Sequence, residues 1–176
     1  MKKLTSTAVA MLIGVVAQAA TFDWTIKSDW VSQDGENPLS GAVYAFDALA
    51  NSSSSVMSAL TGGNMSILSS AVANGTVDGD GAFWFNGNGG LTDDGGSPAK
   101  ASVYMLILDS TTPSSATGAF VSDAIEVKLT DAVLAGGAFF AWDEINVASF
   151  TPIPEPTSGL LVFFGLAGLA LKRKRV

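Results

Sequence analysis

The chain has 176 residues, with nine Lys and Arg, sixteen Asp and Glu, no His and no Cys. These two absences exclude a thiol nucleophile, a histidine general base, a disulfide, a zinc site of Cys or His ligands and a His-ligated haem. Between residues 20 and 152 three lysines stand against fifteen acidic residues, which leaves a formal charge of −12. Because so acidic a surface repels phosphate backbones, we expect no nucleic-acid binding.

The first twenty residues have the three-part pattern of a secretory signal. Two lysines follow Met1, an apolar run covers Ala8–Val16, and small residues stand at Ala17 and Ala19. This order predicts a signal peptide over residues 1–19 that signal peptidase cuts between Ala19 and Ala20. The alternative is a buried amphipathic helix, which would not require that order.

Residues 20–152 are the size of one domain, and their hydrophobic pattern is mainly that of β-strands. Apolar and polar residues alternate over Phe22–Lys27 and again over Ile125–Leu129, which predicts two half-buried strands. The run Val103–Leu108 is continuously apolar, as expected of a strand that is covered on both faces.

Four glycines each precede a short run of apolar or aromatic residues. We interpret Gly41, Gly81, Gly118 and Gly137 as turn residues that begin strands. The strands so predicted cover 43–46, 83–85, 120–121 and 139–142. Six to eight short strands in all are typical of a small β-sandwich or a jelly-roll-like body.

The segment 51–73 departs from this pattern, because it is rich in Ser, Ala, Met and Leu with apolar residues three and four apart. It predicts one or two short helices, capped by Ser52 or Ser53 and by Asn64. A Ser-rich surface loop is the alternative interpretation.

Glycine-rich loops that carry acidic residues make Asp78 and Asp80 weak calcium candidates, since calcium prefers oxygen ligands. The spacing of an EF-hand is absent, and Asp-Gly and Asn-Gly also form tight turns, which is the interpretation we favour. The aromatic residues Trp84 and Trp142 suggest stacking on sugar rings in a lectin-like module. The competing interpretation places both in a small β core.

Carboxylate catalysis has little support in the pattern. Asp143 and Glu144 are adjacent, and neighbours on a strand point to opposite faces, whereas a glycosidase needs two facing carboxylates. Asp109 or Asp123 would have to supply a partner, and nothing selects either residue. We therefore predict that the body is not an enzyme.

The last 25 residues have the features of a second targeting signal. Prolines at 152, 154 and 156 keep the chain extended, residues 157–171 carry no charge, and a basic cluster closes the chain. At about 22 Å an apolar helix of that length is short for a ~30 Å hydrocarbon core. Basic residues remain on the cytoplasmic side of a membrane, so the body is expected outside. The basic cluster consists of Lys172, Arg173, Lys174 and Arg175.

Taken together, Pro154-Glu155-Pro156, the apolar stretch and the basic end resemble the PEP-CTERM sorting signal of exosortase substrates. The resemblance implies that Pro154, Glu155 and Pro156 are the recognition residues and that the helix holds the chain transiently in the inner membrane. It also implies that an exosortase-type enzyme cuts near the motif and releases or transfers the body outward. The family belongs to Gram-negative-type bacteria and accompanies exopolysaccharide production.

The sequence thus predicts a signal peptide (1–19), an exported β-rich body (20–152) and a sorting signal (153–176). We expect a structural protein of the cell surface or extracellular matrix, without a cofactor, whose partners are signal peptidase, an exosortase-type enzyme and extracellular polysaccharide. A calcium- or carbohydrate-binding adhesin module is the first alternative. A carboxylate-based glycan hydrolase is the second.

Overall fold

The computed structural model describes residues 22–129 and 137–154. Several predicted features lie outside these residues: the signal peptide with Ala17, Ala19 and Ala20, the motif residues Glu155 and Pro156, the apolar stretch 157–171, and the basic cluster Lys172, Arg173, Lys174 and Arg175. The described strands are β1 (Asp23–Ser28), β2 (Val31–Gln33), β3 (Asn37–Pro38), β4 (Ala42–Asp47), β5 (Ala73–Thr76), β6 (Phe83–Asn88), β7 (Lys100–Leu108), β8 (Gly118–Val121), β9 (Ile125–Lys128), β10 (Ala138–Trp142), β11 (Ile145–Val147) and β12 (Thr151–Pro152). The helical elements are α1 (Ser53–Thr61) and the 3-10 turns η1 (Met65–Ser70) and η2 (Pro113–Ser115).

The prediction of a mainly β body with few short helices is confirmed. The largest sheet has the order β12-β8-β7-β4-β5, and β9 pairs with β7 beyond the end of β8. Two smaller sheets have the orders β10-β1-β6 and β11-β2-β3. The two smaller sheets are consecutive, because β1 is followed by β2 and β10 is followed by β11. The pairing of β1 with β10 and the pairing of β2 with β11 are both parallel.

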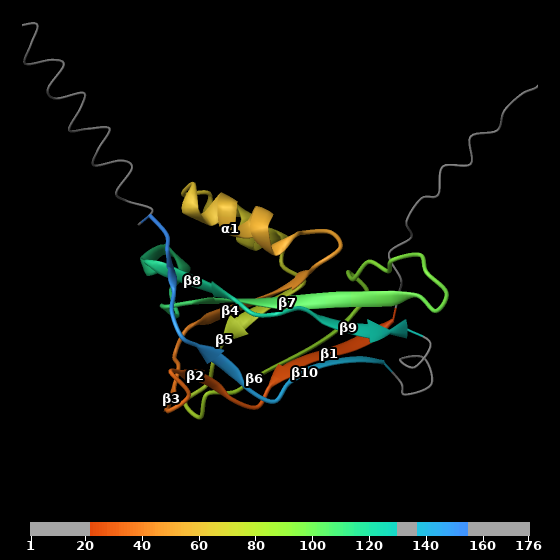
Figure 1. Cartoon of the computed structure of the whole chain (residues 1–176), viewed down its shortest axis with the longest axis horizontal. Coiled ribbons are helices and arrows are strands. Elements are labelled where there is room, and N and C mark those ends of the chain that lie inside the picture. Colours follow the sequence, from red (N-terminus) through yellow and green to blue (C-terminus); the bar gives the residue numbers. More distant parts are fainter. Residues whose placement is uncertain (1–21, 130–136, 155–176) are drawn as a thin grey trace, which may run out of the picture.

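The elements form three layers, which are visible in Figure 1. Inward side chains of the smaller sheets pack against one face of the largest sheet and form the first hydrophobic cluster, which includes Ile26, Val103 and Phe140. The opposite face of the largest sheet packs against α1 and η1 and forms the second cluster, which includes Phe46 and Leu60. The largest sheet is therefore covered on both sides.

Strand β7 is the central strand of this arrangement, and its side chains alternate between the two clusters. Val103, Met105 and Ile107 lie in the first cluster, while Tyr104 and Leu106 lie in the second. All five are at most 1% exposed. The predicted strand covered on both faces is thus confirmed, and the alternation follows from the two-residue period of a strand.

The local signals of the helical segment are also confirmed. The Ser52 hydroxyl accepts a hydrogen bond from the Ser55 amide (3.2 Å) at the start of α1, and Val56 and Leu60 are its buried residues. The Asn64 side chain accepts from the Ser66 amide (3.1 Å) at the start of η1. Side-chain oxygens at these positions satisfy amides that a first helical turn leaves free.

Two details differ from the sequence prediction. The described residues contain twelve strands rather than six to eight, because β2, β3, β5, β11 and β12 have only two to four residues each. In addition, Asn86-Gly87-Asn88 contains one of the Asn-Gly pairs that are typical of tight turns, but it forms the second half of β6, since it pairs with β1. Gly87 is required there by the close approach of the Trp24 ring, which occupies the place of a side chain.

A buried polar pair lies near the end of β4. Asp47 is 1% exposed, and its carboxylate accepts hydrogen bonds from the backbone amides of Leu49 (2.9 Å) and Thr92 (2.7 Å). The Tyr104 ring stacks on Phe46 at 5.6 Å, and its buried hydroxyl has no hydrogen-bond partner among the described residues. Burial, and secondarily the Asp47 charge, raises the pKa of Tyr104 to about 12.

The double burial of β7 predicts that two adjacent substitutions are equally harmful. We expect Leu106→Ala and Ile107→Ala each to lower the free energy of unfolding by about 2–5 kcal/mol, because each leaves a cavity in a different cluster. Urea denaturation of the purified variants measures this. Leu49→Ala is the control: Leu49 is 48% exposed, and its change should stay within about 0.5 kcal/mol. A negligible effect of either β7 substitution would contradict the two-sided burial.

Tyr104→Phe should raise the free energy of unfolding by about 1 kcal/mol at neutral pH, because it removes a buried hydroxyl without a partner. The substitution should also weaken the dependence of the free energy of unfolding on pH in the alkaline range. The unfolded chain loses the tyrosine proton near pH 10 while the folded chain retains it to about 12, so stability falls as pH rises through this window. Urea titrations at pH 7 to 11 measure both effects. A less stable Phe variant with the wild-type pH slope would contradict this account.

Candidate functional site

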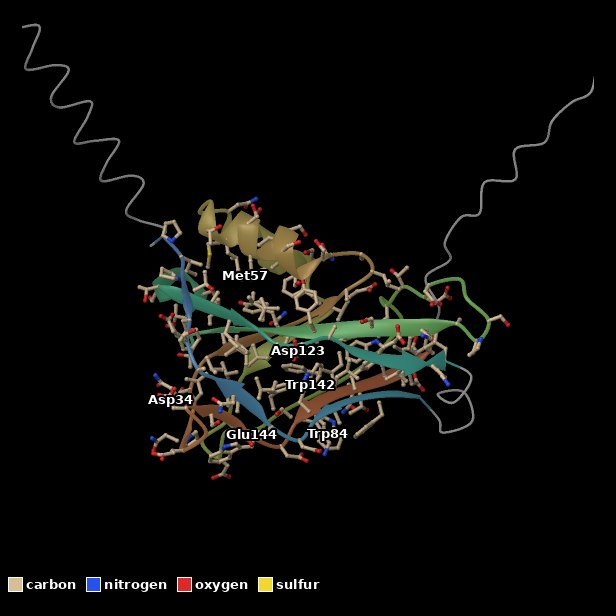
Figure 2. All side chains as sticks on the ribbon, viewed as in Figure 1. Asp34, Met57, Trp84, Asp123, Trp142 and Glu144 are labelled. Carbon is tan, nitrogen blue, oxygen red and sulfur yellow. The ribbon has the colours of Figure 1, made fainter. Side chains whose placement is uncertain are left out.

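The outer face of sheet β10-β1-β6 carries the most exposed aromatic residues that the structure describes. Trp84 is 59% exposed and Phe139 is 50% exposed, and Trp84 lies on the side of the molecule opposite α1 (Figure 2). The strand period places them there, since Phe83, Phe140 and Trp142 next to them point into the first cluster. We call the residues of this surface the aromatic face: Asp23, Thr25, Lys27, Trp84, Asn86, Asn88 and Phe139.

Lys27 holds the two aromatic rings in position. Its ammonium group lies 5.5 Å from the centre of the Trp84 ring and 5.7 Å from that of Phe139, and the two rings meet edge to face at 6.5 Å. The same ammonium donates to the Asp29 carboxylate at 2.8 Å. Only 19% of the Lys27 side chain is exposed, so its methylenes are covered while the rings remain open.

Hydrogen bonds fix the polar groups beside the rings. The Asn86 side-chain oxygen accepts from the Trp84 indole N–H (3.0 Å) and from the Thr25 hydroxyl (2.7 Å). Further along the same strands, the Asn88 amide donates to the Asp23 carboxylate (2.6 Å). These contacts restrict the Trp84 rotamer, so its exposed ring is prepared for contact rather than free to rotate.

Two shallow depressions flank Asn86 on this surface. One, of about 680 Å³, is lined by Asp23, Thr25, Asn86, Asn88 and Phe139 among others. The second, of about 600 Å³, shares Asn86 and Asn88 and adds Trp84 and Asn74. Aromatic rings beside amides and hydroxyls suit a ligand with apolar C–H faces and many hydroxyl groups.

The other aromatic candidate lies inside the protein. Trp142 is 9% exposed, belongs to the first cluster, and donates its indole N–H to the Asp123 backbone oxygen (3.3 Å). Of the two tryptophans selected from the sequence, Trp142 is therefore a core residue and Trp84 is the one available to a ligand. The sugar-binding prediction did not include Thr25, Lys27, Asn86 or Phe139, although the two-residue period of their strands places them on the face of Trp84.

The calcium candidates belong to a turn. The Asp78 carboxylate accepts from the backbone amides of Asp80 (3.0 Å) and Ala82 (2.8 Å), and the Asp78 amide donates to the Ala82 oxygen (2.8 Å). The Asp94 carboxylate likewise accepts from the Gly96 and Lys100 amides, which lowers its pKa. Within residues 22–129 and 137–154, no three acidic side chains gather where they could hold a metal ion.

The carboxylates considered for catalysis do not converge. Asp143 and Glu144 are both exposed and lie between β10 and β11, where Glu144 accepts a long hydrogen bond from Ser32 (3.4 Å). The Asp109 carboxylate accepts hydrogen bonds from the amide (2.9 Å) and the hydroxyl (2.7 Å) of Thr117. Asp123 is exposed near Trp142 (Figure 2).

The described chain ends at the start of the predicted sorting signal. Strand β12 pairs with β8 through Thr151↔Ala119 and Pro152↔Gly118. Ile153 then donates its amide to the Thr117 oxygen (2.8 Å) and is 5% exposed in the second cluster. Pro154, the first residue of the predicted motif, is exposed. None of the helices described is long and apolar enough to cross a membrane.

Comparison with known proteins identifies the C-terminal segment. Residues 152–175 match the family model of the PEP-CTERM protein-sorting motif. No curated protein and no solved structure matches the chain. The match confirms the resemblance of residues 153–176. It implies export, transient association with a membrane, processing by an exosortase-type enzyme and delivery toward the cell surface.

Proposed function

We propose that this chain is a structural protein of the extracellular matrix, delivered by exosortase-type sorting, and that its body associates with neutral polysaccharide through the aromatic face. The PEP-CTERM motif at residues 152–175 carries the sorting part of the proposal. The exposed aromatic face supports the matrix part. The body itself is proposed to be non-enzymatic.

The charge of the body decides which polysaccharide suits it. Fifteen acidic residues against three lysines repel a polyanionic chain, and the lysine on the aromatic face is already paired with Asp29. A neutral glycan avoids this repulsion. Its pyranose rings present C–H groups to Trp84 and Phe139 and hydroxyl groups to Thr25 and Asn86.

The alternatives have less support. A calcium-dependent adhesin built on Asp78 and Asp80 would have to replace the backbone hydrogen bonds that the Asp78 carboxylate already accepts. A glycan hydrolase would need two facing carboxylates, and Asp143 and Glu144 are adjacent residues in the link between β10 and β11. Trp84, by contrast, needs no rearrangement to meet a sugar.

The sorting role predicts that the motif carboxylate is needed for processing. We expect Glu155→Gln in the full chain to reduce removal of the tail at least tenfold, because the substitution removes the charge of the recognition motif but keeps its shape. Intact-mass measurement of cell-associated and extracellular protein reports whether residues 155–176 remain. Glu144→Gln, an exposed acid in the body, is the matched control. Complete tail removal in Glu155→Gln would contradict recognition through this residue.

The matrix role predicts measurable binding to neutral glycans. Calorimetric titration of the processed protein with a neutral glucan should show binding that added salt barely weakens, while a polyuronate should bind less well. Trp84→Ala should weaken the binding roughly tenfold, equivalent to about 1–2 kcal/mol for a lost stacking contact. Leu49→Ala, which removes an exposed apolar side chain outside the aromatic face, should leave it unchanged. Equal affinity of the Trp84→Ala and Leu49→Ala variants for the glucan would contradict binding through the aromatic face.

A further inference from the structure

We infer that β12 and Ile153 lock the sorting signal to the folded body, so that the processing enzyme breaks a peptide bond on the C-terminal side of Pro154. This inference rests on the sorting role proposed above and adds to it the limits of the processing site. It depends only on residues that the structure describes, 109–119 and 150–154.

The first support is the backbone. Thr151 and Pro152 are paired with β8, and the Ile153 amide donates to the Thr117 oxygen at 2.8 Å. Thr117 is itself fixed, because its amide and hydroxyl donate to the Asp109 carboxylate, and the Asp109 amide donates to the Gly118 oxygen at 3.1 Å. The peptide bonds up to Ile153 are therefore part of the sheet.

The second support is side-chain burial. Ile153 is 5% exposed and packs in the cluster between the largest sheet and α1, with Leu108, Ala116 and Ala119. Phe150 approaches Gly118 so closely that a side chain at that glycine would meet the Phe150 Cβ at 2.6 Å. Pro154 is exposed, so the change from a buried to an exposed side chain falls between two adjacent residues.

This boundary limits the bond that an enzyme can reach. Enzymes that cut a backbone bind their substrate as an extended strand over several residues, with main-chain hydrogen bonds on both sides. For a bond before Pro154, those hydrogen bonds are already used by β8 and Thr117. Cutting there would first require β12 to leave the sheet and Ile153 to leave the cluster. The chain would then lose the hydrogen bonds of β12 and the burial of the Ile153 side chain.

The chemical step is the same wherever the bond lies. One backbone C–N bond breaks, and the carbonyl carbon gains the hydroxyl group of a water or the oxygen or nitrogen of a nucleophilic acceptor. The departing nitrogen takes the displaced proton and leaves as the amine of the tail. The body therefore keeps Ile153 and Pro154 in either case, and only the group added at its new end differs.

A spacer in the full chain tests the inference. We would insert six residues, Gly-Ser-Gly-Ser-Gly-Ser, between Ile153 and Pro154, which moves the intact motif Pro154-Glu155-Pro156 away from the body without touching β12. The mature extracellular protein is then analysed by intact mass and by tandem mass spectrometry of its C-terminal peptide. We expect the wild-type peptide to include Pro154 and the variant peptide to include the whole spacer followed by Pro154.

The possible outcomes separate the inference from the sorting role. A mature wild-type protein that ends at or before Ile153, or a variant that lacks the spacer, overturns the inference while processing still occurs. A mature protein that keeps residues 155–176 overturns the sorting role and the inference with it. Since the spacer lies beyond the last buried residue, its variant should unfold at the wild-type urea concentration, which checks that the body is intact.

Discussion

The double burial of β7 is the constraint on which the rest of the fold depends. A strand with apolar side chains on both faces needs two covers, and the chain supplies the smaller sheets on one side and α1 with η1 on the other. β4 lies beside β7 and follows the same rule, with Val43 and Ala45 in one cluster and Ala42 and Phe46 in the other. The smaller sheets then have one buried face only, which leaves their other face open to carry function.

Sequence patterns predicted the elements whose signal is local. The alternation in β1, the apolar run of β7 and the caps Ser52 and Asn64 each act within a few residues. The missed strands β2, β3, β5, β11 and β12 are too short to show a period. β3 pairs with β2 close by in the sequence, but each of the others depends on a partner distant in sequence, as β12 does on β8 and β5 does on β4. Such pairings follow from the complete fold and leave little trace in the sequence.

The two candidate sites differ in the same way. The sorting motif is contiguous, so the resemblance that implies recognition through Pro154, Glu155 and Pro156 rests on adjacent residues. The aromatic face combines three strands, and its residues meet only because β1 lies between β6 and β10. The sequence could not tell the exposed Trp84 from the buried Trp142, since both stand in strands that contain other aromatic residues. Which face of a strand meets the core is decided by its neighbours.

The parallel pairing of β1 with β10 joins the two ends of the described body. β1 also pairs with β6, but its contact with β10 requires almost all of the intervening chain, and such distant contacts form late because a long loop must close first. Until residues 138–142 join the fold, the sheet of the aromatic face consists of β1 and β6 alone and lacks Phe139. The order of the strands thus makes the aromatic face complete only when the C-terminal part of the described body has docked.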